Sequence, residues 1–479
     1  MCRNFHTQQT DTVQRLTGAL CGNSGQDPPI ITQTMAVDNV EIVTQDEIGK
    51  SAIKKASWRL LPLIGIGYGV AYIDRANISF ASLQMNKDLH FSATIYGLGA
   101  GLFFLSYAAC EIPSNLMLYR WGARVWLSRI MITWGIIATS MMFVRTPNQF
   151  YIVRFLLGMA EAGFFPGVIY YLMQWFPLEL RARAISRFYI SNPLATAVMG
   201  ALAGALLSLQ GRLGLAGWQW LFLLEGLPAI VLSVVFFCLL PDCPSQAKWL
   251  TPAERDWIET RIQADAESKN QSHGIVDALR DPRVMQIGAF SLCMQLAAYA
   301  FAFSQPAILK NLTGFSTKNV GFLVTGMGIS GALAMLWTAA RSDRLKERYI
   351  HIVVPFVLIF MGFLIAGIST VALIAVPALT FMMIGFSALQ APYLSLAPEF
   401  LKKKSLAAGI AAINMIGIMG GFLGPLWMGW AKDHTKSDQL GMVALTLPSI
   451  VAIGIILNMR RIHLQQVKPV IDVADRIAT

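Results

Sequence analysis

The chain has 479 residues, of which 55% are hydrophobic and 14% are charged, whereas soluble domains carry about 25% charged residues. This composition, with a mean hydropathy of +0.53, excludes an ordinary soluble domain. The formal net charge of +11 does not indicate nucleic-acid binding, because the basic residues gather in alternate short loops between apolar segments.

The first 58 residues are polar and lack the apolar core of a secretory signal, so we expect residues 1–58 to form a cytoplasmic tail. Continuous apolar runs follow, each near the roughly 20 residues that a membrane-spanning helix requires. These runs lack the alternation of a transmembrane β-barrel. We place twelve predicted spans at residues 59–80, 94–118, 125–144, 150–173, 184–209, 220–240, 284–308, 320–340, 350–369, 372–393, 406–430 and 440–459.

The longest predicted loop, residues 241–283, divides the twelve spans into six plus six. The sequence therefore predicts an all-α membrane protein with an N-terminal bundle at 59–240, a cytoplasmic linker loop at 241–283, a C-terminal bundle at 284–459 and a cytoplasmic tail at 460–479. Within the linker loop, Thr251 and Glu254 flank Pro252 in the pattern of a capping box, which indicates a short surface helix.

The loops differ in their lysine and arginine content. The four short loops after spans 2, 4, 8 and 10 hold twelve of these residues, whereas the six loops on the opposite side hold seven. Because cytoplasmic loops are enriched in lysine and arginine, both termini are expected in the cytoplasm.

A basic turn occurs at matching places in the two halves, as YRWGAR at 119–124 and SDRLKER at 342–348. This repeat resembles the inside loops of the major facilitator superfamily, whose two pseudo-symmetric six-helix bundles enclose a midplane site and rock around it. The first copy lacks the usual acid, since Tyr119 stands there. Arg120, Arg124, Asp343 and Arg344 then form a predicted conformational latch, or alternatively only set the orientation of the chain.

Four charged residues stand out inside predicted spans, where a charge at the helix centre costs about 2.5–3.5 kcal/mol on insertion scales. They are Asp74 and Arg75 in IDRANIS, and Arg154 and Glu161 in RFLLGMAEAGFFPG. Arg154 and Glu161 are seven residues apart and share a helix face, whereas Asp74 and Arg75 point about 100° apart and cannot pair well. Either the four form a static cluster joining spans 1 and 4, or they line a cavity. Arg154 could also extend to the membrane surface.

The residue types suggest a chemistry. Arginine stays protonated and offers a planar fork that matches a carboxylate. Burial favours the neutral form of a carboxylic acid, so a buried acid can bind and release a proton near neutral pH. One arginine to hold an anion, together with acids that carry protons, is sufficient for proton-coupled uptake of an organic anion.

IDRANIS, IPSN at 112–115, RFLLGMAEAGFFPG followed by WFP, and WQWLFLLEGLPA at 218–229 together resemble the anion:cation symporter family of the superfamily. The resemblance runs from about Lys54 to the C-terminus. It implies transport of organic acids such as tartrate, sugar acids, phthalate or hydroxyphenylacetate. It also implies that Asp74 and Glu161 carry protons. We expect Arg75 to bind substrate and Arg154 to organise Glu161.

Other polar residues in the spans could line the cavity or hold helices together. Glu111, near the cytoplasmic end of span 2, is a candidate gate residue. Glu225 lies in the first turns of span 6, where an acid suits the helix dipole, and we interpret it as structural. The further candidate substrate-binding residues are Tyr72, Tyr107, Asn192, Gln305, Tyr393 and Asn414.

We therefore expect a proton-coupled symporter of a small organic carboxylate, monomeric, in a bacterial inner membrane, with an exchanger or exporter of the same fold as the alternative. A membrane metabolite sensor fits less well, because the tails are short. The sequence contains no GxxxxGK[ST] motif, no metal-ligand spacing and no nucleophile–base arrangement. Neither an enzyme nor a bound cofactor or metal is expected, and the expected partners are the anion, protons and lipid.

Overall fold

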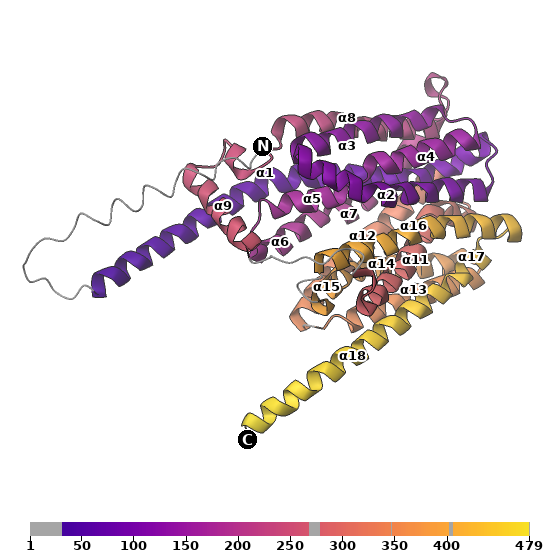
Figure 1. Ribbon diagram of the computed structural model, residues 1–479. Coiled ribbons are helices and arrows are strands. Elements are labelled where there is room, and N and C mark those ends of the chain that lie inside the picture. The colour runs from indigo at the N-terminus through magenta and orange to yellow at the C-terminus, as the bar shows by residue number, and fades with distance from the viewer. Residues whose placement is uncertain (1–30, 268–277, 346, 402–405, 479) are drawn as a thin grey trace, which may run out of the picture. The chain divides into compact units, whose positions relative to one another are not determined.

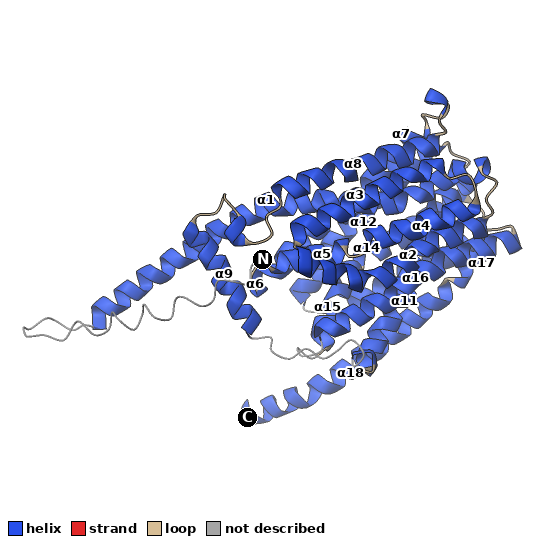
Figure 2. Ribbon diagram, turned by 45° about the horizontal axis from the view of Figure 1, so that its top comes forward, coloured by secondary structure: helices blue, strands red, loops and turns tan. Residues whose placement is uncertain are grey.

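A computed structural model describes residues 31–267, 278–345, 347–401 and 406–478. In this part of the chain every regular element is a helix, and Figure 2 accordingly draws blue helices joined by tan loops. The predicted all-α class is confirmed.

The helices of the first half cover the predicted spans, and two of these spans, 150–173 and 184–209, are each divided between two helices. The second of them, α2, begins after Ser92, whose side chain accepts from the backbone of Ile95, and α4 begins with a capping box between Thr146 and Gln149. Figure 1 draws these helices from indigo to magenta. They are α1 (Ile31–Asp88), α2 (Ala93–Trp121), α3 (Ala123–Ser140), η2 (Met141–Phe143), α4 (Pro147–Glu161), α5 (Phe164–Met173), α6 (Leu178–Tyr189), α7 (Ser191–Leu207), η3 (Arg212–Gly214) and α8 (Gly217–Leu239).

The connecting segment and the second half are also helical. Asp281 caps α11 by accepting from the backbone of Arg283, with Pro282 in the first turn. The helices are η4 (Pro244–Gln246), α9 (Pro252–Glu267), α11 (Pro282–Thr313), α12 (Thr317–Leu345), α13 (Ile350–Ile368), α14 (Ala372–Ala388), α15 (Gln390–Phe400), α16 (Leu406–Thr435), α17 (Gln439–Ala444) and α18 (Thr446–Ala478).

Eleven segments of the described chain are long and apolar enough to cross a membrane. The predicted first span, within α1, is not among them. Asp74 and Arg75 lower the mean hydropathy of this stretch, so it is less apolar than the other eleven segments.

Both predicted tails are helical over the described residues, and their place in the cytoplasm stays a prediction. Helix α1 begins at Ile31, far before the expected start at residue 59, and α18 continues to Ala478 although a tail was expected from residue 460. The polar residues of both segments are mostly good helix formers, and polarity alone does not end a helix. The chain divides into two compact units, Met1–Ser51 and Ala52–Thr479.

The two halves meet along two helix pairs, α2 with α16 and α7 with α12. At the second pair the backbones touch: a Cβ atom at Gly200 would overlap the carbonyl oxygen of Gly321, and one at Gly321 would overlap that of Gly200. Small residues are required where helices approach this closely. The contact joins the C-terminal part of α7 to the N-terminal part of α12.

The surface helix α9 is attached to the first half. The expected capping box is confirmed, since the Thr251 amide donates to Glu254 at 2.9 Å and the Glu254 amide donates to the Thr251 hydroxyl at 3.3 Å. Glu254 also pairs with Lys55 of α1 at 2.7 Å. Asp265, in the last turns of α9, accepts from the backbone of Leu178 at 2.7 Å, at the start of α6. The connecting helix is therefore held against α1 and α6.

Candidate functional site

The four charged residues of the predicted spans come together inside the first half. Asp74 and Arg154 are 1% exposed and Glu161 is fully buried, whereas the Arg75 side chain keeps 17% of its accessible surface. Arg75 is thus the most exposed member of the set. Arg154 does not extend to the membrane surface, so that alternative is excluded.

Arg75 forms an ion pair with Glu161. Its Nε and Nη2 atoms both lie 2.6 Å from Glu161 Oε1, and Oε2 has no hydrogen-bond partner among the described groups. We expected Arg154 to organise Glu161, but Arg75 makes that contact. The roles expected for the two arginines stay predictions, whereas the expectation that Asp74 and Arg75 face different partners agrees with the geometry.

The position of Glu161 follows from a break in the fourth predicted span. Helix α4 ends at Glu161, Ala162 leaves the helix with ψ 132°, and Gly163 adopts φ +86°, a left-handed conformation that glycine tolerates. The carboxylate therefore stands at a helix C-terminus, where a negative charge is unfavourable. The Arg75 guanidinium offsets that charge. The predicted span at 150–173 matches a segment, Pro147–Met173, that is long and apolar enough to cross a membrane, and this break interrupts its helix.

Arg154 is held by backbone and by an aromatic ring. Its Nε and Nη2 atoms donate to the carbonyl oxygens of Gly99 and Ala100, each at 3.4 Å, and its guanidinium lies 4.9 Å from the ring centre of Phe103. The Arg75 guanidinium lies 5.5 Å from that same ring. Phe103 therefore contacts both cations, an arrangement that contributes about 0.5–2 kcal/mol for each when it is shielded from water.

Asp74 lies beside these groups without an ion pair. Its Oδ1 accepts from Asn77 Nδ2 at 3.3 Å, and its Oδ2 has no hydrogen-bond partner in the described part of the chain. Asp74 interacts electrostatically with Glu161 and Arg154. The cluster thus holds two acids and two arginines, with only one ion pair formed between them.

Two of the secondary candidates, Tyr107 and Tyr72, interact with Arg75, and a third, Asn192, interacts with Tyr72. The ring centre of Tyr107 is 4.9 Å from the Arg75 guanidinium, and Tyr72 and Asn192 lie next to one another between α1 and α7. Tyr299 of α11, which sequence reasoning missed, interacts with Arg75 and Glu161 and has its ring centre 4.3 Å from that of Phe104. A tyrosine in the apolar run of span 7 was the available signal.

The other three candidates have partners elsewhere. Gln305 contacts the sulfur of Met327 at 3.6 Å, and the Tyr393 hydroxyl lies 2.8 Å from that of Ser291. Asn414 donates to both carboxylate oxygens of Glu111, at 3.0 and 3.2 Å. This contact joins α16 to α2, so Glu111 and Asn414 link the two halves.

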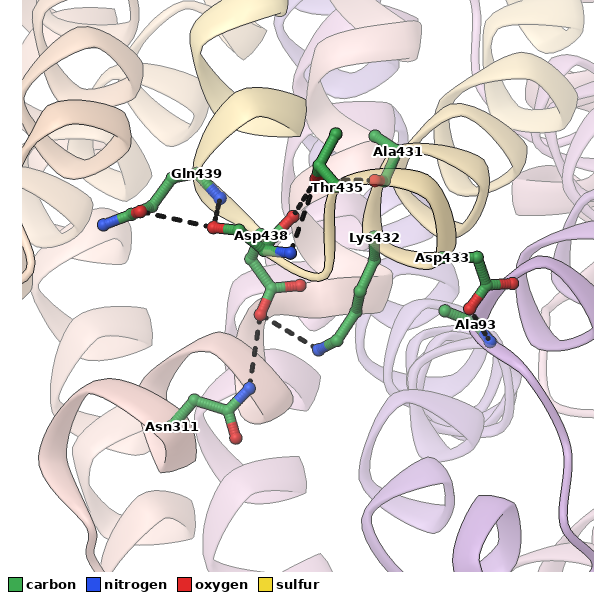
Figure 3. A network of polar contacts seen from close by, with 9 residues as sticks. Ala93, Asn311, Ala431, Lys432, Asp433, Thr435, Asp438 and Gln439 are labelled. Carbon is green, nitrogen blue, oxygen red and sulfur yellow. Dashed lines mark hydrogen bonds and ion pairs between the residues drawn. The ribbon is translucent and has the colours of Figure 1, made fainter.

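At one end of the helix bundle, α16 closes against α2 (Figure 3). Asp433 accepts from the backbone amides of Ala93 at 3.1 Å and Thr94 at 2.7 Å, which are the first two residues of α2. A carboxylate at a helix N-terminus satisfies amides that have no partner within the helix and complements the helix dipole. We call this contact of Asp433 with Ala93 and Thr94 the Asp433 clamp.

The segment after Asp433 is itself fixed to the second half. Asp438 accepts from Lys432 at 2.9 Å and from Asn311, at the end of α11, at 3.2 Å (Figure 3). These bonds hold the turn between α16 and α17 on α11. The Asp433 clamp therefore connects one fixed segment of the second half to the start of α2.

The predicted latch stays a prediction. Arg124 donates to the carbonyl oxygen of Phe237 at 2.5 Å, and its backbone amide donates to Asp242 at 2.8 Å, so these contacts lie within the first half. Arg120 and Arg344 are exposed, and the side chain of Asp343 lies outside the described side chains.

Comparisons with known proteins agree with this architecture. A family model described as Major Facilitator Superfamily matches residues 64–425. The chain is 43% identical over 402 residues to the "Putative tartrate transporter" of Agrobacterium vitis, covering 84% of this chain and 89% of that protein. It is 38% identical over 411 residues to the "Quinolone resistance transporter" of Acinetobacter baumannii, covering 85% and 94%. A solved bacterial homolog of the human lysosomal transporter Spinster, in an inward-facing and occupied conformation, aligns with a TM-score of 0.69 at 15% identity, covering 84% and 96%.

Proposed function

Because the chain belongs to the Major Facilitator Superfamily, we propose that it is a secondary active transporter that carries a small organic anion together with protons by alternating access. As a member it is a multi-pass integral membrane transporter of a small molecule and not an enzyme, as the sequence indicated. Its resemblance to the anion:cation symporter type is confirmed by relatives of that type. The name of the Agrobacterium relative supports a hydroxycarboxylate such as tartrate as substrate.

The Arg75–Glu161 ion pair is the observation that carries this proposal. One guanidinium fork cannot serve Glu161 and a substrate carboxylate fully at once. Protonation of Glu161 removes the charge that holds Arg75, and the released fork binds the incoming anion. Conversely, an anion on Arg75 makes the ionised form of Glu161 lose its partner, so the substrate favours uptake of a proton.

Asp74 extends the same coupling. It interacts with both Glu161 and Arg154, and its Oδ2 has no hydrogen-bond partner in the described structure. A proton on Asp74 lowers the repulsion between the two acids when Arg75 is engaged by substrate. Arg154, fixed by the carbonyls of Gly99 and Ala100, stays as a permanent positive charge beside them.

The proposed orientation follows from the basic loops. If the loops containing Arg120, Arg124 and Arg344 face the cytoplasm, then the Asp433 clamp lies at the opposite, periplasmic end. The structure then represents a state closed to the periplasm. We propose a bacterial inner-membrane location with both termini in the cytoplasm, and a monomer as the working unit.

Transport by purified protein in liposomes tests the proposal. Wild-type protein should accumulate labelled tartrate when the outside is made more acidic, and Asp74→Asn and Glu161→Gln should lose this accumulation while still exchanging internal for external tartrate. Asp256→Asn, an exposed acid on α9, is the matched control and should behave like wild type. Galactonate, phthalate, hydroxyphenylacetate and nicotinate complete the substrate panel. Accumulation by both acid variants at the wild-type level would refute the assigned coupling.

A second candidate function is export, because one relative is named for quinolone resistance. Expression in a quinolone-sensitive host decides between the two. Raised resistance that depends on Arg75, without accumulation of any acid of the panel, would favour export over uptake.

A further inference from the structure

A third acid is buried in the first half, where it interacts with Asp74, and is not used by the mechanism above. Glu225 of α8 is 3% exposed, and neither of its carboxylate oxygens has a hydrogen-bond partner among the described groups. We propose, building on the proposed function, that Glu225 is a third proton-carrying residue, which exchanges its proton with Asp74 during the transport cycle.

The position of Glu225 in α8 argues against the structural role first given to it. The helix begins at Gly217, so Glu225 is its ninth residue and lies beyond the first turn, where the favourable effect of the helix dipole is confined. The next residue, Gly226, packs against Gly135 and Thr139 of α3, so this part of α8 lies deep between helices. An ionised carboxylate there would have no hydrogen bonds to replace those of water, so burial favours the neutral form in this conformation.

Among the charged residues on the helices around Glu225, Asp74 is the one with which we propose that it exchanges a proton. Helix α8 packs against α3, α7, η2 and α1, through contacts that include Trp218 with Asp88. Neither α7 nor η2 contains a charged residue, and the charged residues of α3, Arg124 and Arg129, lie in its first half. Glu225 interacts electrostatically with Asp74 of α1.

Asn77 and the unsatisfied oxygens connect the two acids. Asn77 donates to Asp74 Oδ1 and also interacts with Glu225, so its amide lies by both. Asp74 Oδ2 and both Glu225 oxygens have no hydrogen-bond partner in the described chain. Two buried acids that interact with the same amide and keep unsatisfied oxygens can exchange a proton, whereas the oxygens of two structural acids would be expected to be satisfied.

The proposed step is a simple proton transfer. The O–H bond of the Glu225 carboxyl group breaks, and a new O–H bond forms on ionised Asp74, leaving Asp74 neutral and Glu225 as the anion. In the alternate conformation Asp74 releases its proton to water, and Glu225 takes up a new proton from water, which together return the site to its starting state. No other reactant is needed.

Accumulation in liposomes measures the role of Glu225 directly. With an imposed difference of one pH unit, each coupled proton contributes about a tenfold factor to the limiting concentration ratio of substrate. Glu225→Gln keeps the shape of the side chain but removes the proton, so accumulation of tartrate should fall about tenfold, with exchange preserved. Glu225→Asp should restore part of it, and Glu259→Gln on α9 is the control that should match wild type.

A second measurement separates failure of this inference from failure of the proposed function. Infrared difference spectra of the purified protein, recorded between acidic and alkaline pH, report protonated carboxyl groups without any substrate. Wild type and Glu259→Gln should share a carboxylic-acid carbonyl band that is missing in Glu225→Gln. If wild-type protein ignores the pH gradient but the band depends on Glu225, the transport proposal fails while the proton on Glu225 stands. If Glu225→Gln keeps both the wild-type spectrum and the wild-type accumulation, the role of Glu225 is refuted.

Discussion

Arg75 makes three contacts with one guanidinium group: the ion pair with Glu161 and the faces of Phe103 and Tyr107. The two rings leave the planar group few orientations, so its fork is directed before any substrate arrives. A preorganised cation of this kind loses little side-chain entropy on binding. At the scale of the residue, Arg75 therefore combines an internal partner with a geometry suited to an external one.

Arg75→Lys tests the importance of that geometry. A lysine keeps the charge but cannot make the bidentate contact, and a hydrogen bond to a charged group contributes about 1.5–3 kcal/mol. The apparent affinity for tartrate should fall about tenfold or more, with a smaller change in the maximum rate. Uptake measured over a range of tartrate concentrations checks this, and an unchanged half-saturating concentration would place the substrate carboxylate elsewhere.

Sequence reasoning found these residues but not their pairing. Charges in apolar runs are rare, so Asp74, Arg75, Arg154 and Glu161 were visible at once. The ion pair was not predicted because helical spacing indicates only which side chains share a face of one helix. The Arg75–Glu161 contact is between two helices. The interpretation of Glu225 as structural depended on where its helix begins. The predicted span begins at residue 220, three residues after the observed start of α8, so Glu225 was expected closer to the helix end than it is.

At the scale of the element, the break between α4 and α5 determines that Glu161 is the last residue of α4. The motif AEAGFF contains one glycine with φ +86°, and a Cβ atom there would overlap the hydroxyl of Ser114 on α2. The break and the packing of α2 against α4 thus depend on one residue. A glycine in an apolar helix is common, so the sequence alone did not distinguish this one from those that only allow helices to pack closely.

Gly163→Ala is therefore expected to destabilise the protein. The left-handed conformation and the overlap with Ser114 together should cost about 1–3 kcal/mol. Gly326→Ala in α12 is the matched control, because open space surrounds its Cβ position and alanine favours a helix by about 0.5–1 kcal/mol. Thermal unfolding of the purified variants in detergent should show a lowered midpoint for Gly163→Ala only. Equal midpoints would mean that the break is not fixed by this glycine.

At the scale of the whole molecule, the halves are joined by backbone as much as by side chains. Gly200 and Gly321 bring α7 and α12 into direct contact, and the Asp433 clamp places a carboxylate of the second half at the start of α2. The spans and their division into two halves were predictable, because hydrophobic length and the long loop determine both. The clamp was not, since a single aspartate in a loop does not reveal that its partners are backbone amides far away in the sequence.

Asp433→Asn should weaken the closed end. The amide keeps the size of the side chain but loses the charge and one acceptor, and such a capping contact contributes about 0.5–2 kcal/mol. A cysteine placed at Gln305, in a chain whose native cysteines are replaced, should react with a membrane-impermeant maleimide about fivefold faster in Asp433→Asn. Asp256→Asn provides the background rate. A rate equal to that background would show that the Asp433 clamp does not hold the end closed.

The bonds of α9 have a consequence for how the polypeptide can be divided. Because Lys55 and Leu178 bind this helix, α9 is attached to the first six spans and not to the last six. A gene cut within codons 268–277 should thus yield two fragments that associate on co-expression and restore uptake, with α9 kept on the first. A cut placed before Thr251 should leave α9 on the second fragment, away from its partners in the first. Uptake by the co-expressed fragments should then be lower.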